Sequence, residues 1–282
     1  MKNRDAWLLA GVIIFLTALL AVPAYRFSKD NSEQMARRYN SRLSPVIMIP
    51  GSSATENRFD GLVSRLNGDR GRKHSLLKVK VEDDGRMVFR GHIAARDNEP
   101  VIVVGFENNR DGYSNIRRQA KMFSKCFEEL SRRYEFNNCK CIGHSNGGLV
   151  WTYFLEHYAG DCDVNFRKLM TIGSPYNFSE ESMKKKSQML SDFMKYSYRL
   201  PDSLVVYSVA GTETYTSDGL VPEKSVETGK YVFQGKVRSF TQITVTGDEA
   251  GHSDLPENGQ IVDLIQKYML DAGMQQPVTG RQ

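Results

Sequence analysis

Gly143-His144-Ser145-Asn146-Gly147-Gly148 is the stretch that decides the fold, because it joins a short apolar run to a helical pattern. The run before it, residues 139–142, is typical of a buried strand, and apolar residues recur at helical spacing after it. The stretch fits G-x-S-x-G, in which a serine occupies a sharp, strained turn between a strand and a helix. Glycines flank that serine because neighbouring main chain passes too close to leave room for side chains. Ser145 is therefore a candidate nucleophile; the alternative is a glycine-rich turn with an incidental serine.

Working outward, short apolar runs alternate with helical patterns along most of the chain. This alternation predicts a mainly parallel sheet covered by helices on both faces, which is an α/β fold. A hairpin is expected where two runs flank Asp84-Gly85. The expected strands are residues 46–49, 76–81, 87–89, 101–104, 139–142, 168–172, 204–209 and 240–245.

The composition limits the class of protein. With 282 residues, of which 25% are charged and 40% hydrophobic, the chain fits one large globular domain. The net charge of +5 is small and spread along the chain, so no nucleic-acid partner is expected. Only 4 cysteines are present, which excludes a disulfide-built scaffold. Their pairing is left open (Cys126, Cys139, Cys141, Cys162), as is the oligomeric state. No metal-ligand spacing and no nucleotide-binding glycine loop occur, so neither metal nor cofactor is expected.

The N-terminal segment predicts the compartment. Residues 6–24 carry no charge, and as a helix they would reach about 28 Å, close to the thickness of a bilayer core. An uncleaved membrane anchor is favoured over a signal peptide cleaved near residues 22–24. Either interpretation places the remainder outside the cytoplasm, on the cell membrane or secreted. The expected organisation is residues 1–25 anchor or signal, 26–44 polar stalk, 45–272 catalytic domain and 273–282 flexible tail.

A serine hydroxyl needs a base that takes its proton, and such a base is most often histidine. Of the 5 histidines, His252 fits best because it lies in a glycine-containing loop between the last expected strand and the last helix. His144 adjoins Ser145, but the chain geometry is expected to point its side chain elsewhere. The other three lie well upstream of the serine or inside a packed helix: His74, His92 and His157.

The third member of such a constellation is a carboxylate that orients the imidazole. Asp218 follows the strand expected at 204–209 and is the candidate. Because it precedes Gly219, an ordinary turn is the alternative interpretation. Two further aspartates compete: Asp202 lies before its strand, and Asp248 lies only four positions from the histidine.

Acyl transfer also needs two main-chain N–H groups that stabilise a developing oxyanion. One is expected from Asn146, directly after the serine. The other is expected from Ser52, in the Pro50-Gly51-Ser52-Ser53 loop that follows the first strand of the domain.

Five motifs, spread over about residues 45–270, carry a resemblance to a known family. They are Ile49-Pro50-Gly51-Ser52-Ser53-Ala54 with Asn57-Arg58-Phe59, the turn at 143–148, Gly173-Ser174-Pro175-Tyr176-Asn177, Ser217-Asp218-Gly219-Leu220-Val221-Pro222, and His252-Ser253-Asp254-Leu255-Pro256-Glu257-Asn258. With these motifs the chain resembles the α/β-hydrolases, and more closely the functionally uncharacterised secreted or membrane-anchored α/β-hydrolases of Gram-positive bacteria. The resemblance implies a Ser145–His252–Asp218 triad and a small helical lid at about residues 176–200. Pro50 departs from the wider superfamily, where a histidine usually precedes the oxyanion-loop glycine.

We therefore expect a serine hydrolase that cleaves an ester-type acyl bond through an acyl-enzyme. Its expected substrate is a small-molecule or lipid ester, and its expected membrane partner is reached through the N-terminal helix. Two alternatives stay open at this point. The same triad could pass the acyl group to another acceptor, as an acyltransferase, or the fold could serve as a non-catalytic surface binding module.

Overall fold

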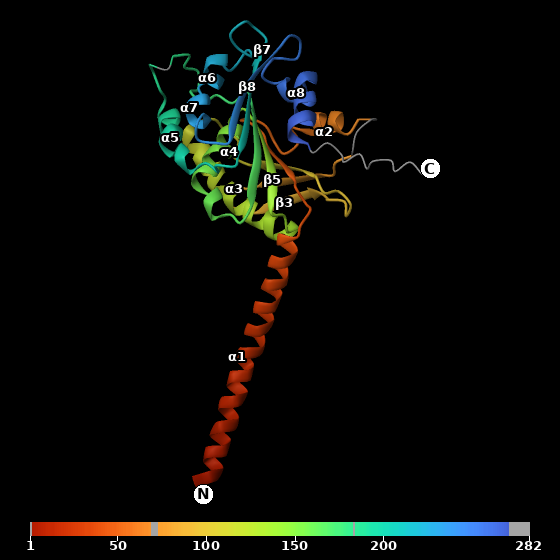
Figure 1. The fold of residues 1–282 in the computed structure, drawn as a ribbon, viewed down its shortest axis with the longest axis vertical. Coiled ribbons are helices and arrows are strands. Elements are labelled where there is room, and N and C mark those ends of the chain that lie inside the picture. Colours follow the sequence, from red (N-terminus) through yellow and green to blue (C-terminus); the bar gives the residue numbers. More distant parts are fainter. Residues whose placement is uncertain (1, 69–72, 183, 271–282) are drawn as a thin grey trace, which may run out of the picture. The chain divides into compact units, whose positions relative to one another are not determined.

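The computed structural model describes residues 2–68, 73–182 and 184–270, and the chain divides into two units at residues 41 and 42 (Figure 1). The first unit is built on one helix, α1 (Lys2–Tyr39), with Pro23 inside it. The helix runs through the apolar segment and continues into the expected polar stalk as far as Tyr39. In the described part of the chain, no helix combines the length and the apolar character needed to cross a membrane. The anchor or signal segment expected at residues 1–25 stays a prediction. The tail expected at 273–282 lies outside the described residues.

The second unit contains the sheet, in which the described residues form eight strands in the order β3-β2-β4-β1-β5-β6-β7-β8. Neighbouring strands pair in parallel, except that β3 is antiparallel to β2 at one edge. The bounds are β1 (Val46–Ile49), β2 (Leu76–Val81), β3 (Met87–Gly91), β4 (Val101–Phe106), β5 (Asn138–His144), β6 (Asn165–Ile172), β7 (Val205–Thr212) and β8 (Ser239–Thr246). The mainly parallel sheet and the hairpin predicted from the sequence are thus confirmed.

Helices cover both faces of this sheet (Figure 1). They are α2 (Asp60–Leu66), α3 (Tyr113–Tyr134), α4 (Asn146–His157), α5 (Gln188–Tyr196), α6 (Glu223–Glu227), α7 (Lys230–Phe233) and α8 (Gly259–Leu264), which continues as a π-helical turn (Ile265–Met269). Single 3₁₀ turns lie at Ala159–Asp161, Ser197–Arg199 and Leu255–Glu257. The expected α/β architecture is confirmed.

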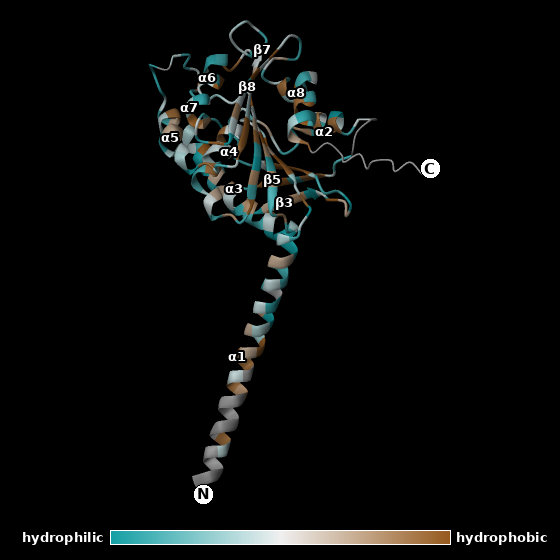
Figure 2. Cartoon of the chain, viewed as in Figure 1, coloured by the Kyte–Doolittle hydropathy of each residue, from teal (hydrophilic) through white to brown (hydrophobic). Residues whose placement is uncertain are grey.

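Side chains of the inner strands alternate between two apolar layers, as the pleat of a strand requires. On β1, Ile47 and Ile49 face the layer shared with α3, α4, α5 and α7, whereas Val46 and Met48 face the layer shared with α2 and α8. Figure 2 shows brown, apolar segments in the inner strands and teal, polar loops around the domain. Because both faces of the sheet are covered, access to the inner strands is left at their ends.

The connection from β6 to β7 contains the segment 176–200, where the sequence predicted a lid. Two parallel neighbouring strands need a crossover, and α5 supplies it. Its buried side chains, Met189, Leu190 and Phe193, belong to the first apolar layer. Residues 188–196 of the expected lid are therefore a packed crossover helix, and a lid function for the segment stays a prediction.

All four cysteines are reduced in the structure. Cys126, Cys139 and Cys141 are buried, and Cys162 is partly buried. Burial raises the pKa of Cys126 to about 12, and burial followed by contact with Cys139 raises the pKa of Cys141 well above its usual value. The thiols of Cys126 and Cys141 are therefore held in the protonated, unreactive form.

Glu156 on α4 is a buried carboxyl group. Neither of its carboxyl oxygens has a hydrogen-bond partner among the described residues. Burial raises the pKa of Glu156 well above 4.5, an effect that the charge of Arg199 only partly offsets. The folded protein therefore keeps a proton that the unfolded chain releases, so the free energy of unfolding falls as pH rises above the ordinary carboxyl range.

Replacing Glu156 by glutamine should remove this decrease in the free energy of unfolding at higher pH, because the amide stays neutral at every pH. Each unit by which the folded pKa is raised costs the unmutated protein about 1.4 kcal/mol at pH values above both pKa values. Urea denaturation at pH 5 and pH 8 measures the effect. We expect Glu156→Gln to reduce the difference between the two midpoints, and an unchanged difference would contradict a protonated Glu156.

Candidate active site

Ser145 stands between the end of β5 and the start of α4, in the turn that the sequence predicted. Its backbone has φ 53° and ψ −127°, a conformation that costs a non-glycine residue about 1–3 kcal/mol. Two contacts from β6 and its loop hold it: the Ser145 N–H donates to the Ile172 carbonyl at 2.8 Å, and Ser174 Oγ donates to the Ser145 carbonyl at 2.8 Å. The strained turn is thus fixed from the neighbouring strand.

The glycines of this turn are required for space. A Cβ on Gly147 would lie 2.0 Å from the carbonyl oxygen of Ile49, and a Cβ on Gly143 would lie 2.3 Å from the backbone nitrogen of Gly148. Both obstacles are main-chain atoms, which cannot rotate away. The first strand and the first turn of α4 therefore pack directly on the turn that carries Ser145.

Replacing Gly147 by alanine is expected to destabilise the domain by about 3 kcal/mol, at the upper end of what overpacking costs. Gly160→Ala is the matched control, since a Cβ there meets no atom within 4 Å. Urea denaturation of the two variants measures the difference. Equal midpoints would contradict the packing described for the turn.

His252 and Asp218 reach Ser145 from the loops after β8 and β7. His252 Nε2 lies 2.9 Å from Ser145 Oγ, and His252 Nδ1 lies 2.6 Å from Asp218 Oδ2. A carboxylate can only accept, so Nδ1 carries the proton and Nε2 is left to accept the serine hydroxyl proton. The three residues are buried and form one continuous hydrogen-bonded chain.

Asp218 both makes the expected turn and contacts the imidazole of His252. Its Oδ1 accepts the N–H groups of Leu220 at 3.1 Å and Val221 at 2.6 Å, which makes the turn, while Oδ2 faces the imidazole. The Asp218 carbonyl also accepts the backbone N–H of His252 at 2.7 Å. The two loops are therefore joined through both side chain and main chain.

The competing residues lie elsewhere. Asp202 precedes β7, at the opposite end of that strand from Asp218, and Asp248 offers its backbone carbonyl to the side chain of Asn258. Of the remaining histidines, the ring of His74 contacts the Glu99 carbonyl and that of His157 stacks on Tyr153.

The loop after β1 lies against the nucleophile. A Cβ on Gly51 would be 2.6 Å from Ser145 Cβ and 3.2 Å from its Oγ, so Ser52 follows a residue in direct contact with Ser145. On the other side, Asn146 begins α4, and its side-chain Nδ2 donates to Asp111 Oδ1 at 2.8 Å. The structure thus places Asn146 and Gly51, the neighbour of Ser52, beside the serine, and the donor function of Asn146 and Ser52 stays a prediction.

Two residues at this site were not assigned a role from the sequence. The His144 side chain contacts the loop that carries His252: its Nε2 lies 3.0 Å from the carbonyl oxygen of His252. Arg58 donates through Nη2 to the Ser253 carbonyl and through Nη1 to Glu257 at 2.8 and 3.0 Å. The contact with Ser253 joins positions 195 residues apart, and no local sequence pattern signals such a contact.

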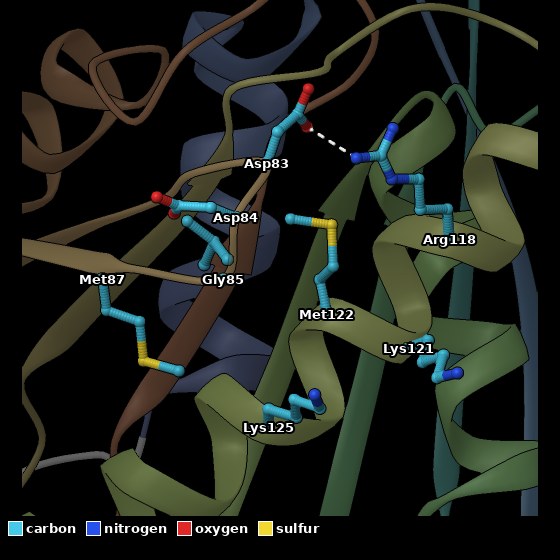
Figure 3. A pocket seen from close by; sticks show the side chains of 9 residues that line it. Asp83, Asp84, Gly85, Met87, Arg118, Lys121, Met122 and Lys125 are labelled. Atoms are coloured by element: carbon cyan, nitrogen blue, oxygen red, sulfur yellow. Dashed lines mark ion pairs between the residues drawn. The ribbon is translucent and has the colours of Figure 1, made fainter.

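A separate pocket of about 250 Å³ lies between the β2–β3 hairpin and α3 (Figure 3). In Figure 3, Met87 and Met122 extend into it, and an ion pair of 3.2 Å joins Asp83 to Arg118 at one end. None of its lining residues belongs to the loops that carry Ser145, Asp218 or His252. Among the described residues, no cluster of histidine, cysteine and carboxylate side chains could hold a metal ion.

Comparison with solved structures gives two similar proteins of full domain length. A candidate cell surface hydrolase from Lactobacillus plantarum WCFS1 is 53% identical with a TM-score of 0.75, over 81% of this chain and 92% of that one. The lin2722 gene product of Listeria innocua is 27% identical with a TM-score of 0.72, over 82% and 96% of the two chains.

More distant structures share the fold alone. The mature lipase BlEst2 of Bacillus licheniformis is 10% identical with a TM-score of 0.51, over 82% of this chain and 93% of that one. No curated protein matches the chain. The model of one family, described as an alpha/beta hydrolase of unknown function (DUF915), matches residues 33–272. On the strength of that match, which spans the sheet and the Ser145 turn, the chain belongs to this family of α/β-hydrolases.

Proposed function

We propose that this α/β-hydrolase is an extracytoplasmic serine hydrolase that cleaves a carboxylic-ester-type acyl bond. The observation that carries the proposal is the hydrogen-bonded chain from Asp218 through His252 to Ser145, with contacts of 2.6 and 2.9 Å. It ends on a serine in a strained strand-to-helix turn, the arrangement that activates a hydroxyl as a nucleophile.

In the proposed reaction, Ser145 Oγ attacks the ester carbonyl carbon while His252 Nε2 takes the hydroxyl proton. The carbonyl oxygen becomes an oxyanion that the N–H groups of Asn146 and Ser52 stabilise. Asp218 holds the imidazole in place and stabilises its cationic form. His252 then protonates the leaving alkoxy oxygen, and the bond from the carbonyl carbon to that oxygen breaks. Water attacks the resulting acyl-enzyme, gives its proton to His252, and the carboxylic acid leaves as the proton returns to Ser145.

The proposed location outside the cytoplasm and the proposed substrate class are supported by observations other than the geometry of the site. The Lactobacillus plantarum relative, 53% identical, is described as a cell surface hydrolase, which supports a location outside the cytoplasm. The uncharged stretch at residues 6–24 fits an export signal. Exposure to the cell exterior favours small-molecule or lipid esters as substrates.

A fluorophosphonate probe tests the proposal, because it reacts with serines that a base has activated. The purified full-length chain should be labelled, and mass spectrometry of its peptides should place the label on Ser145. A panel of p-nitrophenyl esters of increasing acyl length then measures kcat/KM for each chain length. A folded protein that takes no label, or takes it on another serine, would contradict the proposed triad.

A further inference from the structure

The ring of His144 lies beside the candidate base. It is buried, its centroid is 4.8 Å from that of His252, and its Nε2 is 3.0 Å from the His252 carbonyl oxygen. A carbonyl oxygen can only accept, so His144 Nε2 carries a hydrogen and donates it. Nδ1 of His144 has no hydrogen-bond partner among the described residues, which agrees with an unprotonated nitrogen there.

Arg58 donates a hydrogen bond to the next backbone carbonyl along the chain, that of Ser253. Its guanidinium donates through Nη2 to the Ser253 carbonyl oxygen, and Nη1 reaches both carboxylate oxygens of Glu257. The Arg58 and Glu257 side chains are only about one fifth exposed (20% and 22%), so solvent screens this pair less than a surface pair. The fixed fork of a guanidinium adds geometric specificity to such contacts.

We propose that His144 and Arg58 are positioning residues that fix the base by holding the consecutive carbonyl oxygens of His252 and Ser253. This inference rests on the proposed function. His144 is the last residue of β5 and directly precedes Ser145, and Arg58 belongs to the loop whose Gly51 lies against Ser145. These two contacts join the loop that carries His252 to Ser145 and to the loop that contains Ser52. The rate of the proposed reaction depends on how His252 is placed relative to both.

The neutral state of His144 fits this role. During the reaction His252 becomes an imidazolium, and a second cation 4.8 Å away would oppose that charge. Burial lowers the pKa of His144 well below its usual value, and the charges of His252 and Arg58 lower it further. The charged groups around the pair are Arg58 and the two carboxylates, Asp218 on His252 and Glu257 on Arg58. The two neighbouring rings then hold opposite tautomers, Nε2–H on His144 and Nδ1–H on His252.

Two substitutions of His144 separate positioning from packing. His144→Phe keeps a ring of similar size but cannot donate, whereas His144→Gln keeps an amide donor. We expect His144→Phe to lower kcat and the rate of fluorophosphonate labelling by about 10- to 100-fold, the loss that a small misplacement causes, with KM changed less than about twofold. His144→Gln should recover most of that loss. Equal rates for unmutated protein and His144→Phe, or equal losses for both variants, would overturn the proposal.

Arg58→Met should likewise lower kcat more than it raises KM. Its matched control is Arg65→Met, because Arg65 pairs with Glu249 at 3.6 Å, in the loop that leads to His252, but with both side chains about half exposed. Equal kcat values for the two variants would overturn a positioning role for Arg58.

A measurement on the unmutated protein does not depend on how the variants fold. Nitrogen-15 histidine labelling and NMR report the tautomer of each ring. Nε2–H on His144 together with Nδ1–H on His252 supports the proposed contacts, and Nδ1–H on His144 overturns them. Failure of the proposed function looks different: the unmutated protein then takes no probe and hydrolyses no ester, whichever tautomers the rings hold.

Discussion

Replacing Ser145 by alanine is expected to abolish fluorophosphonate labelling and to lower kcat for ester hydrolysis by roughly 10⁶-fold, the loss seen when the nucleophile of a comparable triad is removed. The hydroxyl supplies the atom that bonds to the carbonyl carbon, and no other group in the hydrogen-bonded chain can replace it. The expected oxyanion donors remain, so a small residual rate above that of water should persist.

The fold should tolerate this change. Alanine meets the same backbone strain as serine at φ 53°, and both backbone contacts of Ser145 remain. Ser253→Ala is the matched control, since Ser253 is exposed and its contact with Arg58 uses its backbone carbonyl, which alanine keeps. Ester hydrolysis and thermal unfolding of both variants measure the effect. Labelling that survives in Ser145→Ala would contradict the assignment of the nucleophile.

Replacing Asp218 by asparagine is expected to lower kcat by about 10⁴-fold while the fold is retained. The amide oxygen can still accept the N–H groups of Leu220 and Val221, so the turn survives. The amide nitrogen, however, donates toward His252 Nδ1, which favours the tautomer with the proton on Nε2. A base protonated on Nε2 cannot take the proton of Ser145.

Asp248→Asn is the control for Asp218→Asn, because the described contact of Asp248 with Asn258 uses its backbone carbonyl. We expect this variant to keep kcat within about threefold, as is usual for a surface change away from the reacting groups. Steady-state kinetics with a p-nitrophenyl ester compares the two. Similar losses in both variants would show that Asp218 does not act through His252.

Much of the fold could be predicted from local patterns. Each inner strand of a parallel sheet is buried on both faces, so runs such as 46–49 and 101–104 are apolar throughout. The G-x-S-x-G turn predicted the position of Ser145 because its glycines pack against main-chain atoms. This requirement for glycine is visible in the local sequence. Asp218 and His252 could be selected as candidate site residues because the loops that follow parallel strands lie at the same end of the sheet.

Other features depend on contacts that the sequence does not display. The sequence predicts a lid at about residues 176–200, but it does not show that this connection also needs a crossover helix, which α5 supplies. Residues 26–39 are polar enough to suggest a stalk, yet their helix-forming side chains continue α1 to Tyr39. Helical periodicity likewise cannot tell that Glu156 is buried, because it reports the apolar residues rather than the polar ones between them.

The packing of main chain on main chain around Ser145 has a consequence for how this enzyme family can diversify. Because main-chain atoms lie where side chains on Gly143 and Gly147 would stand, we expect larger residues at these two positions to destabilise the domain. The loops that follow β6 and β7 have no such restriction over their exposed residues, for example 184–186 and 213–216. Laboratory evolution toward new esters should therefore accumulate its productive changes in these loops, and the proposed chemistry and the choice of substrate can change independently.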